Sequence, residues 1–168
     1  MCFTIDNKTL GRENFHKDIV CYKVVIKNED GTYRPSLIDV ELILPWKLGD
    51  TIIPDILGLP IEEHSYTNQT GGYKQIRHGI NSFRMNGANT TLLNYFGLQA
   101  CQNIERWKIN ATVVMLKCII PAGTDYFLNY YEFGNILISE KLILVKEVTQ
   151  DQYFASLSDE TIISVTTM

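Results

Sequence analysis

The sequence lacks the features that would assign it to a membrane or secreted class. Its 168 residues contain no apolar run approaching the roughly 20 residues that cross a bilayer. The first residues, Met-Cys-Phe-Thr-Ile-Asp, show neither the charged region nor the apolar region of a signal peptide. We therefore expect a cytoplasmic protein with no membrane partner.

The sequence also lacks a strongly basic balance. Its net charge is −4 and its isoelectric point is about 5.3, with lysine and arginine scattered along the chain. A protein that binds nucleic-acid backbone needs a basic face, so no nucleic-acid partner is expected. A basic pocket confined to one part of the surface is still compatible with this composition.

Metal-binding and nucleophile motifs are missing as well. The four cysteines, Cys2, Cys21, Cys101 and Cys118, share no C-x-x-C spacing, and three sit among apolar neighbours, as reduced core cysteines do. The three histidines are far apart in sequence, and no serine lies within a nucleophile elbow. We expect no disulfide, no metal and no cofactor.

What the sequence does contain is a strong apolar signal over residues 113–148. The runs V-V-M-L-K-C-I-I (113–120) and I-L-I-S-E-K-L-I-L-V-K-E-V (136–148) are separated by Pro121, Gly123 and a loop. A half-exposed strand alternates apolar and polar residues, and these runs do not. They predict two strands buried on both faces.

Further elements follow from shorter patterns. Residues 19–26 predict a core strand closed by a turn at 28–31, and residues 37–44 fit a strand or a short helix. Residues 45–72 hold so many glycines and prolines that we expect no long regular element there, but an insertion or a segment that covers a ligand. Residues 76–83 predict another strand, in which Gly79 marks a close backbone approach or a bulge.

One main helix is expected after residue 86. Asn86 or Asn89 would cap it, Leu92, Leu93 and Phe96 would form its apolar face, and Gly97 would end or dent it. The sequence T-Q-D-Q (149–152) fits a capping box that begins a short helix, and residues 161–165 fit a last strand or a frayed end.

These elements predict one domain over residues 1–168, of α+β class. Strands come before and after the helix with few β-α alternations. The sheet would be mixed or mainly antiparallel, with one main helix and a short C-terminal helix.

Several residues are candidates for ligand binding, each with an ordinary structural alternative. Glu140 lies within an apolar run and would be a catalytic or ribose-binding acid, or a strand-end carboxylate in solvent. Lys23, next to Tyr22, could present its ammonium to a phosphate, or snorkel at a sheet edge. Arg77 and Arg84 could hold an anion with His78, or belong to a solvated loop.

Aromatic residues are dense after residue 125. Tyr126, Phe127, Tyr130, Tyr131 and Phe133 could stack on a nucleotide base. Core packing or the interface of a homo-oligomer explains the same cluster equally well.

Four stretches resemble a group of small uncharacterised proteins from bacteriophages and gut bacteria. They are D-I-V-C-Y-K-V-V (18–25), G-I-N-S-F (79–83), K-C-I-I-P-A-G-T-D-Y (117–126) and I-S-E-K-L-I-L-V (138–145). The group's pattern has a histidine in the second stretch where this chain has Asn81. If that histidine has a chemical role, this chain has lost it.

The order of the motifs also resembles the ADP-ribosyltransferase-like fold. The resemblance implies an early strand with a polar residue for NAD, here Tyr22 or Lys23. It implies a middle strand with Ser82 that leads into a helix, and a late strand with an acid, here Glu140.

Together these features predict an accessory protein of phage type, in the host cytoplasm, that binds a small nucleotide or ADP-ribose-like ligand and sequesters a host defence signal. Lys23, Arg77 and Arg84 would bind phosphate, Tyr126 the base, and Glu140 or Ser82 ribose hydroxyls, with Tyr22 beside them. One alternative is an ADP-ribosyltransferase or NAD-cleaving enzyme with Glu140 as its catalytic residue. The other is a structural or protein-interaction module.

Overall fold

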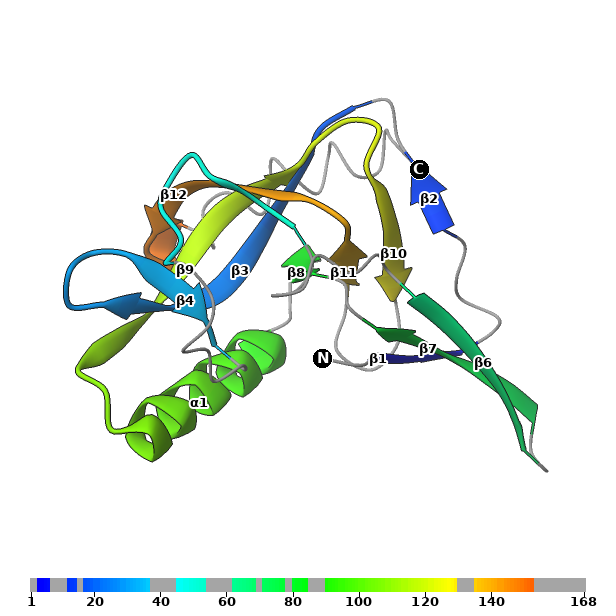
Figure 1. The fold of residues 1–168 in the computed structure, drawn as a ribbon, viewed down its shortest axis with the longest axis horizontal. Coiled ribbons are helices and arrows are strands. Elements are labelled where there is room, and N and C mark those ends of the chain that lie inside the picture. Colours follow the sequence, from blue (N-terminus) through cyan, green and yellow to red (C-terminus); the bar gives the residue numbers. More distant parts are fainter. Residues whose placement is uncertain are drawn as a thin grey trace.

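Two long antiparallel strands, β3 (Ile19–Asn28) and β9 (Ala111–Ile120), form the centre of the computed structural model (Figure 1). The structure describes residues 3–6, 12–14, 17–36, 45–53, 62–68, 71–77, 80–84, 90–129 and 135–152. Side chains are described over 17–36, 45–53, 80–83, 96–124, 126 and 137–152.

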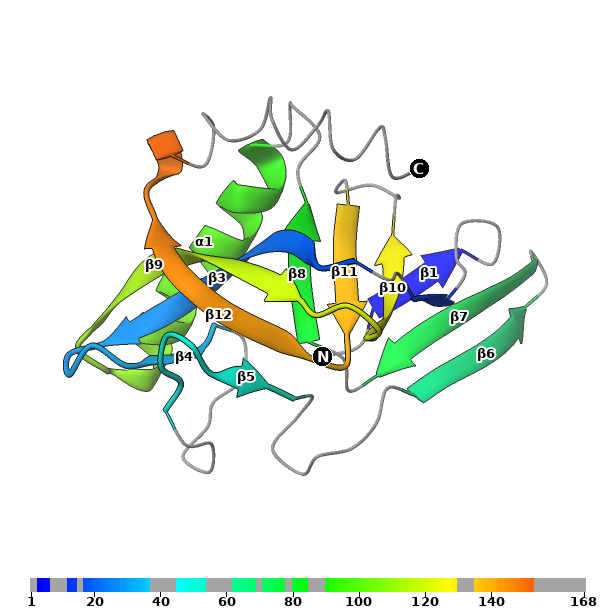
Figure 2. The ribbon, with the colours of Figure 1, turned by 90° about the horizontal axis from the view of Figure 1, so that it is seen from above.

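Nine strands of the described residues belong to one sheet. Eight follow the order β2-β10-β11-β8-β3-β9-β12-β5, and β4 pairs with β3 beside this path. Figure 2 shows β8, β11 and β10 side by side next to the central strands. Besides β3 and β9, the bounds are β2 (Arg12–Asn14), β4 (Tyr33–Pro35), β5 (Thr51–Ile52), β8 (Ile80–Arg84), β10 (Asp125–Asn129), β11 (Asn135–Ser139) and β12 (Leu142–Val148).

A second, three-stranded sheet has the order β1-β7-β6. Its strands are β1 (Phe3–Asp6), β7 (Gly71–Arg77) and β6 (Glu62–Asn68). All pairings between the described strands are antiparallel. The predicted α+β class with a mainly antiparallel sheet and one main helix is therefore confirmed.

The main helix, α1 (Thr90–Trp107), covers one face of β3 and β9 (Figure 1). Phe96 and Ala100 of α1 pack in a cluster with alternate residues of β3, namely Tyr22, Val24 and Ile26. Burying such side chains contributes about 1.5–3 kcal/mol each. This first cluster holds the helix on the sheet.

The opposite face of the central strands carries a second cluster. Cys21 and Val25 of β3 pack there with Leu116 and Cys118 of β9. Adjacent residues of both strands therefore point into different buried clusters, because side chains alternate across a strand. The prediction that residues 113–120 form a strand buried on both faces is confirmed.

The second predicted run does not form a single strand. It contains β11 and β12, which are separated by Glu140 and Lys141. The Ser139 side chain is fully buried, and its Oγ donates to the Lys141 carbonyl oxygen at 3.0 Å. This bond stabilises a turn of two residues, which the continuous apolar sequence hides. The expectation that Glu140 lies inside a strand was wrong.

Residues 62–84 also differ from expectation. The segment predicted to lack long regular structure contains β6 and the start of β7, paired from Glu62↔Arg77 to Asn68↔Gly71. The strand predicted over 76–83 is two strands, β7 and β8, in different sheets. Residue 79 and its proposed bulge lie outside the described residues, as do 37–44, Asn86, Asn89 and 161–165.

Gly97 neither ends nor interrupts α1. The helix continues to Trp107 and ends with Lys108 at a positive φ of 53°. There the Lys108 N–H donates to the Glu105 carbonyl and the Ile109 N–H to the Ile104 carbonyl, which is a Schellman motif. Ile104 and Ile109 both pack against the first cluster, and this packing outweighs the roughly 1 kcal/mol that a helical glycine costs.

The predicted C-terminal capping box is present. The Thr149 Oγ1 accepts a hydrogen bond from the Gln152 N–H at 3.1 Å, and the Thr149 N–H donates to the Gln152 Oε1 at 2.9 Å. Residues 150–152 are helical. The two bonds satisfy donors at the start of a second, short helix.

Candidate ligand-binding site

Lys23 is the most unusual polar residue of the central sheet. It lies in the middle of β3 on the face of the second cluster, between Cys21 and Val25 and opposite Leu116 of β9. Its side chain is only 6% exposed. A lysine is almost never buried to this extent unless it is paired, so its partners are informative.

The neighbouring strand β8 supplies these partners. The Lys23 Nζ donates to the Asn81 main-chain oxygen at 2.6 Å and to the Asn81 Oδ1. β3 pairs with β8 at Tyr22↔Phe83 and with β4 from Val25 onward. Lys23 therefore lies where this edge of β3 changes its neighbour from β8 to β4, and its ammonium reaches across to β8.

The surroundings oppose the charge of Lys23. Desolvation by burial lowers its pKa from 10.5 to about 8, and the nearby Cys118 and Cys21 act in the opposite direction. Burial also raises the pKa of the Cys118 thiol well above its usual value. At neutral pH the thiol stays protonated and the ammonium stays charged.

Ser82, also on β8, is buried beside this position. It is 3% exposed and pairs in register with Leu137 of β11, a member of the second cluster. Within the described residues its Oγ has no hydrogen-bond partner. Burying a hydroxyl without a partner costs about 1–3 kcal/mol, so a polar group that reaches it would recover that free energy.

Together Lys23 and Ser82 offer donors that the described protein groups do not use. An ammonium has three N–H donors, and both of its acceptors here belong to Asn81. The pairing of Tyr22 with Phe83 places β3 and β8 side by side where Lys23 and Ser82 lie. The arrangement suits an oxygen-rich ligand that accepts from the ammonium and exchanges a hydrogen bond with the hydroxyl.

The structure does not bring Tyr22 to this face. Tyr22 is buried in the first cluster, on the helix side of the sheet, with its ring 6.5 Å from that of Phe83. Tyr126 is on the same side of the sheet as Lys23 but is only 1% exposed and packs in the second cluster. Either tyrosine would have to become accessible before it could stack on a base.

The two arginines lie on different sheets. Arg77 ends β7 of the three-stranded sheet, paired with Glu62, and Arg84 ends β8 of the large sheet, paired with Asn135. Their side chains lie outside the description, as do those of His78, Phe127, Tyr130, Tyr131 and Phe133.

Glu140 occupies the turn between β11 and β12 and is partly exposed. The preceding residue, Ser139, pairs with Ile80 of β8 and with Tyr126 of β10. Asn81 pairs with Ile138, so Glu140 comes two residues after the position on β11 that lies opposite Asn81. Glu140 directly follows the last residue of β11, whereas Lys23 lies in the middle of β3.

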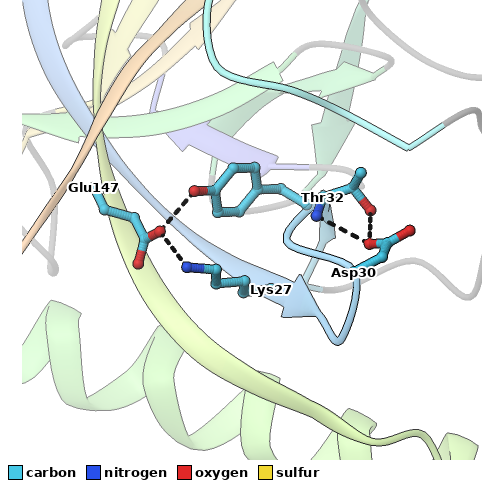
Figure 3. Close-up of polar contacts among 5 residues, drawn as sticks. Lys27, Asp30, Thr32 and Glu147 are labelled. Atoms are coloured by element: carbon cyan, nitrogen blue, oxygen red, sulfur yellow. Dashed lines mark hydrogen bonds and ion pairs between the residues drawn. The ribbon is translucent and has the colours of Figure 1, made fainter.

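A second polar cluster lies near the C-terminal end of β3. Glu147 Oε2 of β12 accepts from the Lys27 Nζ at 2.7 Å and from the Tyr33 hydroxyl at 2.6 Å. Figure 3 shows Lys27 and Glu147 pointing toward each other near the hairpin in which Asp30 accepts from Thr32. These groups satisfy one another, so the cluster ties the β3–β4 hairpin to β12.

Hydrogen bonds to Lys27 and Tyr33 lower the pKa of Glu147. Desolvation by burial, with the hydrogen bond to Glu147, raises the pKa of Tyr33 to about 12. Both shifts follow from the structural role of the cluster and do not indicate a reactive group.

The sequence did not identify Asn81, Cys21 and Cys118 as neighbours of Lys23. Cys21 and Cys118 are direct partners across β3 and β9, and both are buried. Their place in the middle of two apolar strands was visible in the sequence. Their register was not, because it depends on how two strands nearly 100 residues apart align.

Within the part of the chain that the structure describes, no helix combines the length and apolar character needed to cross a membrane. Comparisons of the chain with models of known protein families, with curated proteins and with solved structures found no match.

Proposed function

We propose that this chain is an accessory protein of phage type that binds a small nucleotide or ADP-ribose-like ligand beside Lys23 and Ser82. The observation that carries the proposal is the buried ammonium of Lys23 next to a buried hydroxyl without a partner. Sequestering a host defence signal would need only such a binding site and no catalysis.

The chemistry of the two groups fits this ligand class. A phosphate offers several acceptor oxygens to an ammonium, and Lys is a common phosphate ligand in proteins. Ribose hydroxyls both donate and accept, as Ser82 does. The resemblance of the motif order to the ADP-ribosyltransferase-like fold, which assigns Lys23 or Tyr22 and Ser82 to an NAD site, would imply the same ligand class.

A thermal-shift screen tests the proposal. The panel contains NAD, ADP-ribose, cyclic ADP-ribose isomers and cyclic dinucleotides, and the ligand is recovered for mass spectrometry. A ligand present at 100 times its dissociation constant stabilises the folded state by about 2.7 kcal/mol. We expect at least one stabilising ligand, recovered intact.

The matched control compares two buried-strand lysines. Lys23→Met should abolish the thermal shift, whereas Lys117→Met should preserve it, because Lys117 pairs with Tyr22 on the opposite face of the sheet. No stabilisation by any ligand in the panel would contradict the proposal and would favour a protein-interaction module.

A second candidate is an ADP-ribosyltransferase-like enzyme. The observation that favours it is the position of β8, which carries Ser82 beside β3 and comes immediately before α1 in the order of elements. In such an enzyme Glu140 would hydrogen-bond the ribose on the nicotinamide side and stabilise developing positive charge.

NAD cleavage distinguishes this candidate from a pure binder. The enzyme would release nicotinamide from NAD, and Glu140→Gln should abolish turnover. NAD cleavage that survives in Glu140→Gln would exclude Glu140 as the catalytic acid, and recovery of intact NAD would exclude the enzyme.

A further inference from the structure

The charge of Lys23 has no described counter-charge. Its two acceptors are a main-chain carbonyl and a neutral side-chain amide, both from Asn81. The described groups that act electrostatically on it are the thiols Cys118 of β9 and Cys21 of β3. A buried cation among neutral groups is stabilised strongly by an anion that replaces its lost hydration.

Resting on the proposed function, we propose that Lys23 and Ser82 form a subsite for one phosphoryl group of the ligand, and that this group replaces the Asn81 Oδ1 as a partner of the Lys23 ammonium. Asn81 then acts as the partner of Lys23 in the free protein. The Ser82 Oγ donates to a second oxygen of the same phosphoryl group.

A phosphoryl group fits better than a neutral ribose hydroxyl or a carboxylate. It carries negative charge, which a hydroxyl lacks, and it has three acceptor oxygens where a carboxylate has two. It can therefore accept from the ammonium and from the hydroxyl through two oxygens and keep a third acceptor, which a carboxylate lacks. Because Asn81 keeps its main-chain oxygen on the Lys23 Nζ, the ammonium does not have to leave β8.

Binding at this subsite should depend on the proton of Lys23. Burial lowers the pKa of Lys23 to about 8 in the free protein, and a phosphoryl anion beside the ammonium raises it again. The other titratable side chains on this face of the sheet are Cys21 of β3, Cys118 of β9, Tyr33 of β4 and Tyr126 of β10. Asn81 and Ser82 of β8 have no titratable group. Affinity should thus be constant below about pH 8 and fall up to tenfold per pH unit above it.

The test follows Lys23 by NMR in full-length protein labelled at the lysine Cε. The Lys23 signal is assigned by its loss in Lys23→Met, and its titration is measured with and without inorganic phosphate at matched ionic strength. We expect phosphate to raise the pKa of Lys23 by about one or more. Ser82→Ala should weaken phosphate binding by about tenfold.

The outcomes separate this inference from the proposed function. If phosphate shifts the Lys23 titration but no nucleotide in the panel binds, the subsite stands and the proposed function fails. If a nucleotide binds while Lys23 titrates as in the free protein, the subsite is overturned and the proposed function stands. If neither phosphate nor any nucleotide affects Lys23, the subsite is overturned as well.

Discussion

Replacing Lys23 with methionine should remove a specific pH dependence of stability. In the unfolded chain the lysine has a pKa of 10.5, and burial lowers it to about 8 in the folded state. Below about pH 8 both states are protonated and the folded state carries the whole desolvation penalty. Between about pH 8 and 10.5 the unfolded state binds more protons, so the stability of the wild type rises with pH.

The size of the effect follows from the same difference. A change of about 2.5 in pKa, at about 1.4 kcal/mol per unit, corresponds to about 3 kcal/mol. Because Lys23 is only 6% exposed, solvent screening reduces this little. Lys23→Met should lack this rise altogether.

The neutral-pH stability of Lys23→Met is less informative than its slope with pH. The variant gains by removing a buried charge but leaves Asn81 without its donor, which costs about 1–3 kcal/mol. These terms oppose each other. The slope isolates the proton on Lys23, because methionine has no titratable group.

Urea denaturation at several pH values between about 7 and 10, in buffers without phosphate, measures this slope. Lys117→Met, which replaces a lysine paired with Tyr22 on the same two central strands, is the control for the substitution itself. Parallel profiles for wild type and Lys23→Met would refute the claim that burial controls the charge of Lys23.

Three further predictions concern the rest of the fold. Because the pKa of Tyr33 is raised to about 12, its contribution to stability is present below about pH 10 and is lost as pH rises toward 12. In urea denaturation, Tyr33→Phe should remove this loss of stability. In a titration followed by tyrosinate absorbance, the variant should show one late-titrating tyrosine fewer than the wild type. Thr149→Ala removes the Oγ1 acceptor of the capping box and should lower the free energy of unfolding by about 1 kcal/mol, whereas an unchanged value in urea would show that the box does not contribute. Phe96→Ala, in the first cluster at 4% exposure, should lower the free energy of unfolding by about 3–5 kcal/mol in the same assay. Leu98→Ala, on the exposed side of α1, should change it by less than about 0.5 kcal/mol. Equal effects of the two substitutions would contradict the observed orientation of the helix.

The central strands could be predicted from the sequence because both of their faces are buried. In β3 and β9, apolar residues occupy most successive positions, and most of them pack in one of two clusters, on opposite faces of the strands. Burial on both faces gives a pattern that does not depend on knowing the partner strand. The capping box was predictable for a similar reason, since its two hydrogen bonds join residues three apart.

The errors occurred where long-range packing outweighs a local signal. The turn at Glu140 and Lys141 interrupts an apolar run whose two halves pair with different strands, β11 with β8 and β12 with β9. Gly97 lies within a helix that is stabilised by its contacts with β3 and β9. Neither set of contacts is visible within a short window of sequence.

The sequence identified Lys23 and Ser82 as candidates but could not explain why they belong together. Lys23 and its partner Asn81 are 58 residues apart, and they meet because β8 lies next to β3 in the strand order. The alternative of a lysine that snorkels at a sheet edge does not hold, since β3 has neighbours on both sides and Lys23 is buried.

The same geometry gives Asn81 a physical role in the free protein. Asn81 offers the ammonium two neutral acceptors, one from the main chain and one from the side chain. A histidine at this position would offer at most one acceptor from its ring, and none when protonated, when it would also repel Lys23. The asparagine amide cannot gain a proton in this way, so it accepts from the Lys23 ammonium without adding a second positive charge. Under the proposed function, Asn81 thus keeps the positive charge of Lys23 available for an anionic ligand.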